Sequence, residues 1–216
     1  MFRYFFILIC LLLSFSGLQA ELAIQNYKIA ITNYKNFYYD KTITLDHDNV
    51  KEATAEILWK KLPEGSAHIV LKNRENEIIG TATGYRRADD DKGNIYFDIR
   101  DADGNLLGIV CAYWNPWIYK YPYNATLFSG EGVPLIEDVF HYYSNGSSFR
   151  IPGTDHLVSK IYRDGFLSKN FMSEVTDLNY LLDINIHPYT YILYQLIRRE
   201  TPNMAYLSFF PVRELR

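Results

Sequence analysis

The sequence predicts a mainly β protein whose strands roll around an apolar helix near the C-terminus. Most of the chain after residue 26 consists of short runs rich in β-branched and aromatic residues, separated by turn residues, a pattern typical of a β-barrel or a β-sandwich. Residues 189–197 are almost wholly apolar on every face of a helix, so other elements must surround them. Because the preceding chain is mostly strand, rolling the strands around this helix is the simplest arrangement.

Residues 1–20 are expected to be a secretory signal peptide. A single positive charge, Arg3, precedes an apolar run at residues 5–15 that only Ser14 interrupts, and Ala20 is a small residue at the expected cleavage point. A transmembrane anchor is the rival interpretation, but this run is well below the roughly 20 apolar residues that a span needs. We therefore expect a periplasmic or secreted protein with no transmembrane span after cleavage.

The length and charge of the mature chain limit the architectures and the classes of partner that it can have. Its length favours one domain, residues 21–200, followed by a C-terminal tail, residues 201–216. The formal net charge is −3, and loss of the signal peptide with Arg3 makes it −4. A nucleic-acid-binding protein usually carries a basic field, so nucleic acid is not an expected partner.

The expected strands follow one another along the whole chain before the helix. The first two cover residues 27–31 and 37–45, and residues 48–61, with apolar positions near helical spacing, are interpreted as a short helix. Turn residues then punctuate a four-stranded meander at residues 68–72, 78–86, 94–100 and 106–113. Further strands are expected at residues 125–128, 135–142, 148–151, 156–163 and 166–171.

The C-terminal helix has recognisable ends in the sequence. A strand-like run at residues 180–186 leads to Pro188, which suits the first position of a helix. Arg198 and Arg199 suit the negative end of the helix dipole, and residues 201–202, Thr-Pro, end the pattern. The helix is therefore expected to have roughly three to four turns, too few to cross a bilayer.

Three short motifs resemble the tubby C-terminal-like superfamily, and in particular its LURP-one-related and phospholipid-scramblase-like branches. The motifs are FDIRDADGNLLG at residues 97–108, VSKIYR at 158–163 and LNYLLDI at 178–184, just before the apolar helix. The resemblance spans residues 67–200 and implies a closed antiparallel β-barrel around a buried hydrophobic C-terminal helix. The chain departs from the family in its signal peptide and in its tail. No motif matches the basic pair that binds phosphoinositide headgroups in tubby proteins, so the resemblance assigns no ligand residue.

The sequence contains no recognisable catalytic motif. Neither a GxSxG elbow nor a zinc-binding histidine spacing is present, although the five scattered histidines could still meet in the fold. Cys111 would be the only thiol of the mature chain, and its apolar strand pattern indicates a small buried hydrophobe, with a catalytic thiol as the alternative. Enzymatic activity is therefore the less favoured interpretation.

Two acidic segments could be mistaken for cation sites. Residues 101–105, DADGN, lack the ligand spacing of an EF-hand, and their Asp, Gly and Asn residues suit a tight hairpin turn. The three adjacent carboxylates in residues 87–94 diverge from one another, which favours a solvated hairpin tip. No metal ion and no cofactor are expected.

The aromatic segment at residues 113–123 is the candidate binding site. If its second half is extended, Trp117, Tyr119 and Tyr121 project from one face, with Trp114 close before them. An exposed face of this kind could stack on sugar rings, lie at a membrane interface or anchor a protein partner. The alternative is that these rings cover the barrel or one end of the helix.

The favoured function is that of an exported, non-enzymatic binding or scaffold protein that contacts a lipid headgroup or another protein. The main alternative is a secreted carbohydrate-binding or hydrolytic protein that uses Trp114 and Trp117 as stacking platforms, and a purely structural envelope protein is a third. Asn124 and Asn145 lie in glycosylation sequons, which matter only in a eukaryotic secretory route.

Overall fold

The structure is a computed structural model that describes seven stretches of the chain, residues 22–34, 40–58, 66–114, 122–141, 146–165, 168–204 and 212–214. The strands are β1 (Tyr27–Tyr34), β2 (Lys41–His47), β3 (Val50–Ile57), β4 (Ile69–Lys72), β5 (Ile78–Arg87), β6 (Ile95–Asp101), β7 (Leu106–Trp114), β8 (Pro122–Phe128), β9 (Pro134–His141), β10 (Gly146–Arg150), β11 (Leu157–Arg163), β12 (Phe171–Val175) and β13 (Val212–Arg213). The helices are α2 (Leu178–Asp183) and α3 (Pro188–Met204).

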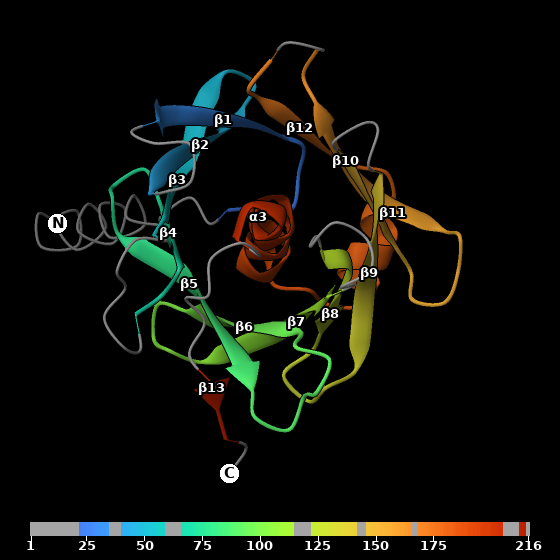
Figure 1. The fold of residues 1–216 in the computed structure, drawn as a ribbon. Helices are drawn as coiled ribbons and strands as arrows, with labels where there is room; N and C mark the ends of the chain where they lie inside the picture. The colour runs from blue at the N-terminus through green and yellow to red at the C-terminus, as the bar shows by residue number, and fades with distance from the viewer. Residues whose placement is uncertain are drawn as a thin grey trace, which may run out of the picture.

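Strands β1 to β12 close into an antiparallel barrel around α3 (Figure 1). The sheet runs from β5 through β4 to β1, continues with β12 and descends to β6, and β6 then pairs with β5. Strand β13 adds to β5 in parallel, outside the closed ring. This arrangement confirms the predicted fold class, a mainly β, closed antiparallel barrel around a hydrophobic C-terminal helix. It is also compatible with the tubby-like resemblance.

Small residues on one wall let α3 lie close to the sheet. A Cβ added at Gly80 would lie 3.2 Å from Leu193 Cδ1, and one added at Gly108 would lie 3.2 Å from Thr190 Cγ2. Ala82 faces the interior beside Gly80 and is fully buried. Helix α3 consequently contacts β4 to β8 directly, and any larger side chain at these glycines would push the helix away.

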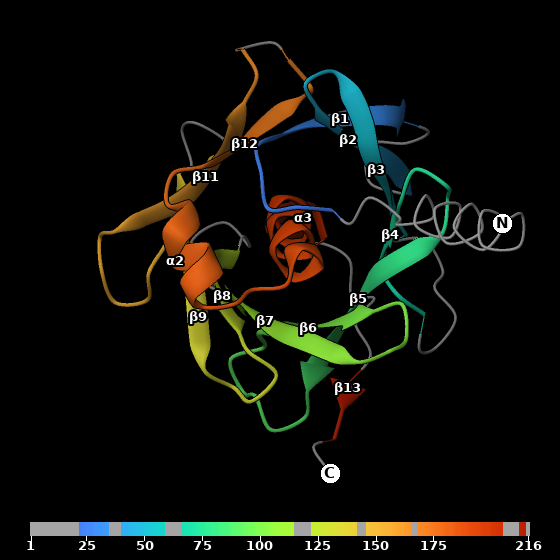
Figure 2. The ribbon, with the colours of Figure 1, turned by 180° about the vertical axis from the view of Figure 1, so that it is seen from behind.

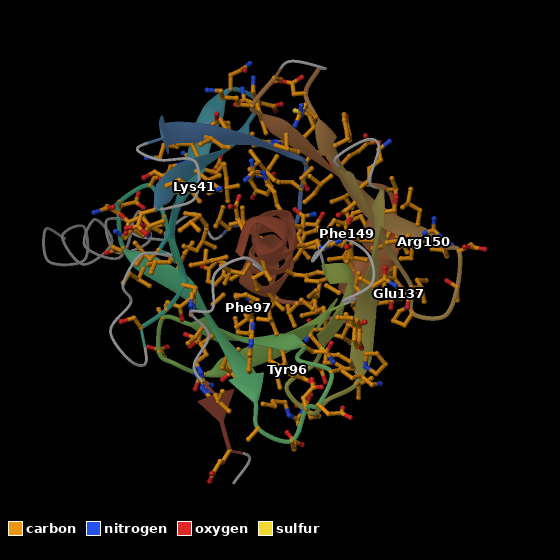
Figure 3. The ribbon with its side chains drawn as sticks, in the orientation of Figure 1. Lys41, Tyr96, Phe97, Glu137, Phe149 and Arg150 are labelled. Carbon is orange, nitrogen blue, oxygen red and sulfur yellow. The ribbon has the colours of Figure 1, made fainter. Side chains whose placement is uncertain are left out.

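Long side chains of α3 fill the space toward the other wall, β9 to β12. Tyr194 packs edge-on against Phe149 of β10 with ring centroids 5.2 Å apart, while its hydroxyl donates a 2.8 Å hydrogen bond to the Ala125 carbonyl of the adjoining strand β8. Ser173 of β12 donates a 2.8 Å hydrogen bond to Gln195 Oε1. Figure 3 shows Phe149 lying between α3 and this wall. The interior is therefore apolar and narrow on one side of the helix, and polar and wide on the other.

The predicted helix at residues 48–61 is wrong, because residues 50–57 form β3. Its buried side chains, Ala53, Ala55 and Ile57, recur every second residue, which is the period of a strand and not of a helix. The strand-like interpretation of residues 180–186 is also wrong, because residues 178–183 form α2. Asp177 caps this helix by accepting a 3.0 Å hydrogen bond from the Tyr180 backbone N–H.

Two element limits also differ from the prediction. Strand β12 covers Phe171–Val175 in place of the expected strand at residues 166–171. Helix α3 does not end at residues 201–202 but continues to Met204. Pro202 lies in the last turn, where its missing N–H removes only one helical hydrogen bond and leaves the buried part of the helix intact.

The ends of the chain lie largely outside the described stretches. These include the predicted signal peptide, residues 1–20, and residues 205–211 of the tail. Within the described residues, the tail contributes the last turn of α3 and then β13. Neither of the two described helices combines the length and the apolar character that a membrane crossing needs.

His68, just before β4, is a buried histidine that stays neutral in the fold. Its Nδ1 accepts a 3.0 Å hydrogen bond from the Gly84 N–H, and its ring meets Phe97 edge-on at 6.3 Å. Burial, and secondarily the positive charge of Arg213, lowers the pKa of His68 to about 4. Protonation of this ring is therefore unfavourable in the folded protein.

Stability should fall as the pH drops from 6.5 toward 4, because the unfolded chain then protonates His68 while the folded protein does not. With an unfolded pKa of about 6.5, the linkage amounts to as much as about 3 kcal/mol of unfolding free energy. Urea unfolding at several pH values across this window measures it. A His68→Asn variant should lack this part of the pH dependence. If the free energy of unfolding falls with pH equally in the two proteins, the prediction is contradicted.

Candidate functional site

The predicted aromatic platform falls almost entirely outside the described residues. Trp117, Tyr119 and Tyr121 lie in the undescribed stretch 115–121, and only the backbone of Trp114 is described, at the end of β7. Tyr113, the residue before it, is 39 % exposed. The stacking role of this segment stays a prediction.

The described residues point to a different site, the end of the barrel at which α3 ends. Charged side chains on the inner faces of the strands meet charged side chains of the last turns of α3 there. We call this group the basic mouth, and it consists of Lys41, Arg163, Arg198, Arg199, Asp138, Glu200 and Phe171.

Strand alternation places the barrel residues of the basic mouth inside. Lys41 shares the inner face of β2 with the buried Ile43 and Leu45, and Figure 3 shows it on the β2 side of the barrel. Arg163 follows Ile161 on the inner face of β11 and is the register partner of Phe171 in β12. The inward position nearest this end of the barrel thus carries a cation in β2 and β11 and an aromatic ring in β12.

The deepest part of the basic mouth is a buried ion pair between α3 and β9. Arg198 Nε donates to Asp138 Oδ2, and both side chains are completely buried. Burial lowers the pKa of Arg198 to about 9, so the guanidinium remains charged at neutral pH. Asp138 Oδ1 has no hydrogen-bond partner among the described residues.

Nearer the end of α3, two cations share one carboxylate. Lys41 and Arg199 both form ion pairs with Glu200, whose side chain is fully buried. The Arg199 guanidinium carbon lies 4.3 Å from the centroid of the Phe171 ring, and that of Arg163 lies 5.9 Å from it. Cation–π contacts of this kind hold guanidinium groups in place without neutralising their charge.

The basic mouth carries more positive than negative charge. Its described side chains include four cations, two on strands and two on α3, and two carboxylates, Asp138 and Glu200. The adjacent pair of Lys28 and Asp164, 3.6 Å apart, adds no net charge. Clustered guanidinium groups suit carboxylate and phosphate oxygens, so this end of the barrel can bind an anion.

A second cluster of arginine and tyrosine, on the outside of β5 and β6, anchors the tail. The Arg213 guanidinium lies 4.1 Å from the Tyr85 ring centroid and donates a 3.0 Å hydrogen bond to Asp98. Tyr85 stacks on Tyr96 at 5.9 Å, and Arg87 lies 5.1 Å from the Tyr96 ring. These contacts hold β13 in place, and Asp98 also pairs with Arg100 of β6 at 3.4 Å.

The other residues singled out in the sequence have structural roles. Cys111 is buried, and burial raises the pKa of its thiol to about 11, which confirms the prediction of a small buried side chain. Residues 101–105 form the predicted hairpin turn, closed by a 3.1 Å bond from the Asp101 N–H to the Asn105 carbonyl, with Gly104 at φ +85°. Among the described residues no three histidine, cysteine or acidic side chains converge as metal ligands would.

Sequence reasoning missed the basic mouth. It interpreted Arg198 and Arg199 only as charges at the end of a helix, and it assigned no role to Lys41. A signal was nevertheless present, because Lys41 occupies a position that alternates with apolar, inward-facing residues.

A comparison with protein-family models finds no match to this chain, and a comparison with curated protein sequences finds none either. A comparison with solved structures finds an Arabidopsis thaliana protein determined by X-ray crystallography. The match has 12% sequence identity and a TM-score of 0.44, and it covers 80% of this chain and 94% of that chain. Function is therefore inferred from the basic mouth itself.

Proposed function

We propose that this chain is an exported, non-enzymatic binding protein whose basic mouth binds the anionic headgroup of a phospholipid. The observation that carries the proposal is the pair of guanidinium groups, those of Arg163 and Arg199, that lie against the Phe171 ring beside the last turns of α3. The tubby-like resemblance, which includes the phospholipid-scramblase-like branch, supports the same class of ligand. The predicted signal peptide would bring the protein to a compartment bounded by membrane.

The geometry suits a phosphate group more than a neutral ligand. Arg163 and Arg199 lie against the same ring, so their guanidinium groups are already ordered and lose little entropy when they bind an anion. Arg199 and Lys41 are almost buried, so a phosphate there would interact in a medium of low dielectric constant. Phe171 offers apolar surface to the glycerol part of a lipid.

Binding to vesicles tests this proposal. We expect the protein to cosediment with vesicles of phosphatidylcholine and phosphatidylglycerol, and not with phosphatidylcholine alone. Arg163→Gln and Arg199→Gln should each weaken binding roughly tenfold, because a charge-assisted hydrogen bond contributes about 1.5–3 kcal/mol.

The matched control removes two positive charges from the outer wall. Lys28 and Lys160 pair with Asp164 and Glu174 at 3.6 and 3.2 Å, and the double variant Lys28→Gln with Lys160→Gln should bind vesicles within about twofold of the unmodified protein. Thermal unfolding would show that all variants are folded. If the control loses as much vesicle binding as Arg163→Gln and Arg199→Gln, or if the protein shows no preference for the anionic vesicles, a binding site in the basic mouth is refuted.

A further inference from the structure

Figure 2 shows the end of the barrel at which α3 begins, with α2 beside it, and the connections at this end are strongly acidic. The connections at this end, all of which the structure describes, are residues 48–49, 73–77, 101–105, 129–133, 151–156 and 176–187. They contain one arginine, Arg74, and nine carboxylates, namely Asp48, Glu75, Glu77, Asp101, Asp103, Glu131, Asp155, Asp177 and Asp183. Arg150 pairs with Asp155 at 2.6 Å, and Arg74 pairs with Glu52 of β3. The side chains of these connections therefore keep a large excess of negative charge.

Helix α2 presents two exposed leucines at this acidic end. Leu178 and Leu182 are 45% and 59% exposed and lie four residues apart, on one face of the helix, whereas Leu181 is buried beneath it. Exposed leucines on a short helix are unusual unless another surface covers them. The pair is therefore an apolar anchor without a partner among the described residues.

Helix α2 is held rigidly, so its leucines do not have to be ordered when a partner binds. The Tyr180 hydroxyl donates a 2.7 Å hydrogen bond to the Leu135 carbonyl of β9. Asp177 caps the helix and lies 2.6 Å from His156 Nε2. The backbone N–H of Tyr180, and then His156, lower the pKa of the Asp177 carboxyl, which therefore stays ionised in mildly acidic solution.

Neighbouring turns extend the surface beyond α2. Strand β9, to which Tyr180 is bonded, begins just after Val133, which is 56% exposed and follows the acidic Glu131. The same turn lies against β7, because a Cβ added at Gly130 would lie 3.6 Å from the Leu106 carbonyl. Apolar side chains are thus set among carboxylates along this edge of the barrel.

We infer that this surface, α2 with the acidic turns around it, docks a basic amphipathic segment of another protein. Leucines on one face of such a segment would cover Leu178 and Leu182, and its lysine or arginine side chains would lie against the carboxylates. An anionic membrane does not fit, because nine carboxylates would be brought against lipid phosphates. The inference does not depend on the proposed lipid site, which lies at the opposite end of the barrel.

The test uses two synthetic peptides of one amphipathic helical pattern, one of Leu and Lys and one of Leu and Glu, with fluorescence anisotropy as the readout. We expect the full protein to bind the Leu/Lys peptide and not the Leu/Glu peptide. Leu178→Ser combined with Leu182→Ser should weaken binding at least about tenfold, as loss of a central apolar anchor does. Asp183→Lys should weaken it further and give measurable binding of the Leu/Glu peptide.

Val212→Ser is the matched control, because Val212 is 66% exposed at the opposite end of the barrel. It should leave binding of the Leu/Lys peptide unchanged. The inference is overturned if the protein does not bind this peptide, or if the leucine variant binds it as well as the unmodified protein. It is equally overturned if Val212→Ser lowers the affinity for the peptide as much as the leucine variant does. It is also overturned if the leucine variants lose vesicle binding and not peptide binding, which would place α2 at a membrane.

Discussion

Replacing Leu193 with Asp should prevent the protein from folding. Leu193 is completely buried in α3, and its Cδ1 lies 3.2 Å from the place where a Cβ at Gly80 would be. A carboxylate at this point would face the small apolar residues of β5. An unpaired buried charge costs several kcal/mol or more, which is comparable with the total stability of about 5–15 kcal/mol of a typical domain.

The measurement is the yield of soluble protein together with its near-ultraviolet circular dichroism and its urea unfolding curve. Leu182→Asp is a control of identical chemistry, because Leu182 lies on the exposed face of α2 and is 59% exposed. This control should fold with nearly unchanged stability. A Leu193→Asp protein that unfolds at the midpoint of the unmodified protein would show that the barrel does not enclose α3.

The overall fold could be predicted because its main constraint is local in the sequence. An apolar helix too short for a bilayer must be enclosed, and strands supply most of the preceding chain. The hairpin turns could be predicted equally well, because a turn position with positive φ, such as that of Gly104 at φ +85°, favours glycine. The meander β4 to β7 was therefore predicted with its limits nearly correct.

The misassigned elements were those in which two periodicities compete. Val50, Ala53 and Ile57 fit helical spacing, but Ala53, Ala55 and Ile57 fit the strand that the sheet requires, and pairing with β2 and β4 decides between them. In α2, consecutive apolar residues imitate a buried strand. The cap at Asp177 was the one local sign of a helix.

The candidate site could not be predicted because its contacts join residues far apart in the chain. Arg198 and Asp138 are 60 residues apart in sequence, and Lys41 meets Glu200 only because β2 faces the end of α3. A single sequence shows that these residues are charged but not that they are neighbours. The sequence does show a charged residue at a strand position whose face is otherwise apolar. Lys41 is two residues from the buried Ile43, and Asp138 is two residues from the buried Ile136.

Breaking the buried pair of Arg198 and Asp138 should destabilise the protein by about 3–5 kcal/mol, because removal of one partner leaves the other charge buried without its counter-ion. The variants are Asp138→Leu and Arg198→Met, which replace each charged group with an apolar side chain. The double variant should recover most of the loss, since an apolar pair of similar volume often replaces a buried ion pair without cost. Urea unfolding of all four proteins gives the coupling free energy as a double-mutant cycle.

Vesicle binding by the same double variant separates the structural role of this pair from the proposed binding role of the rim. Asp138→Leu with Arg198→Met removes one negative and one positive charge, so the net charge of the basic mouth does not change, and Arg163 and Arg199 keep their contacts with Phe171. The double variant should therefore still bind phosphatidylglycerol vesicles, whereas Arg199→Gln should bind them more weakly. Single variants that cost less than about 1 kcal/mol would show that water reaches the pair, and loss of binding in the folded double variant would place the anion against Arg198 itself.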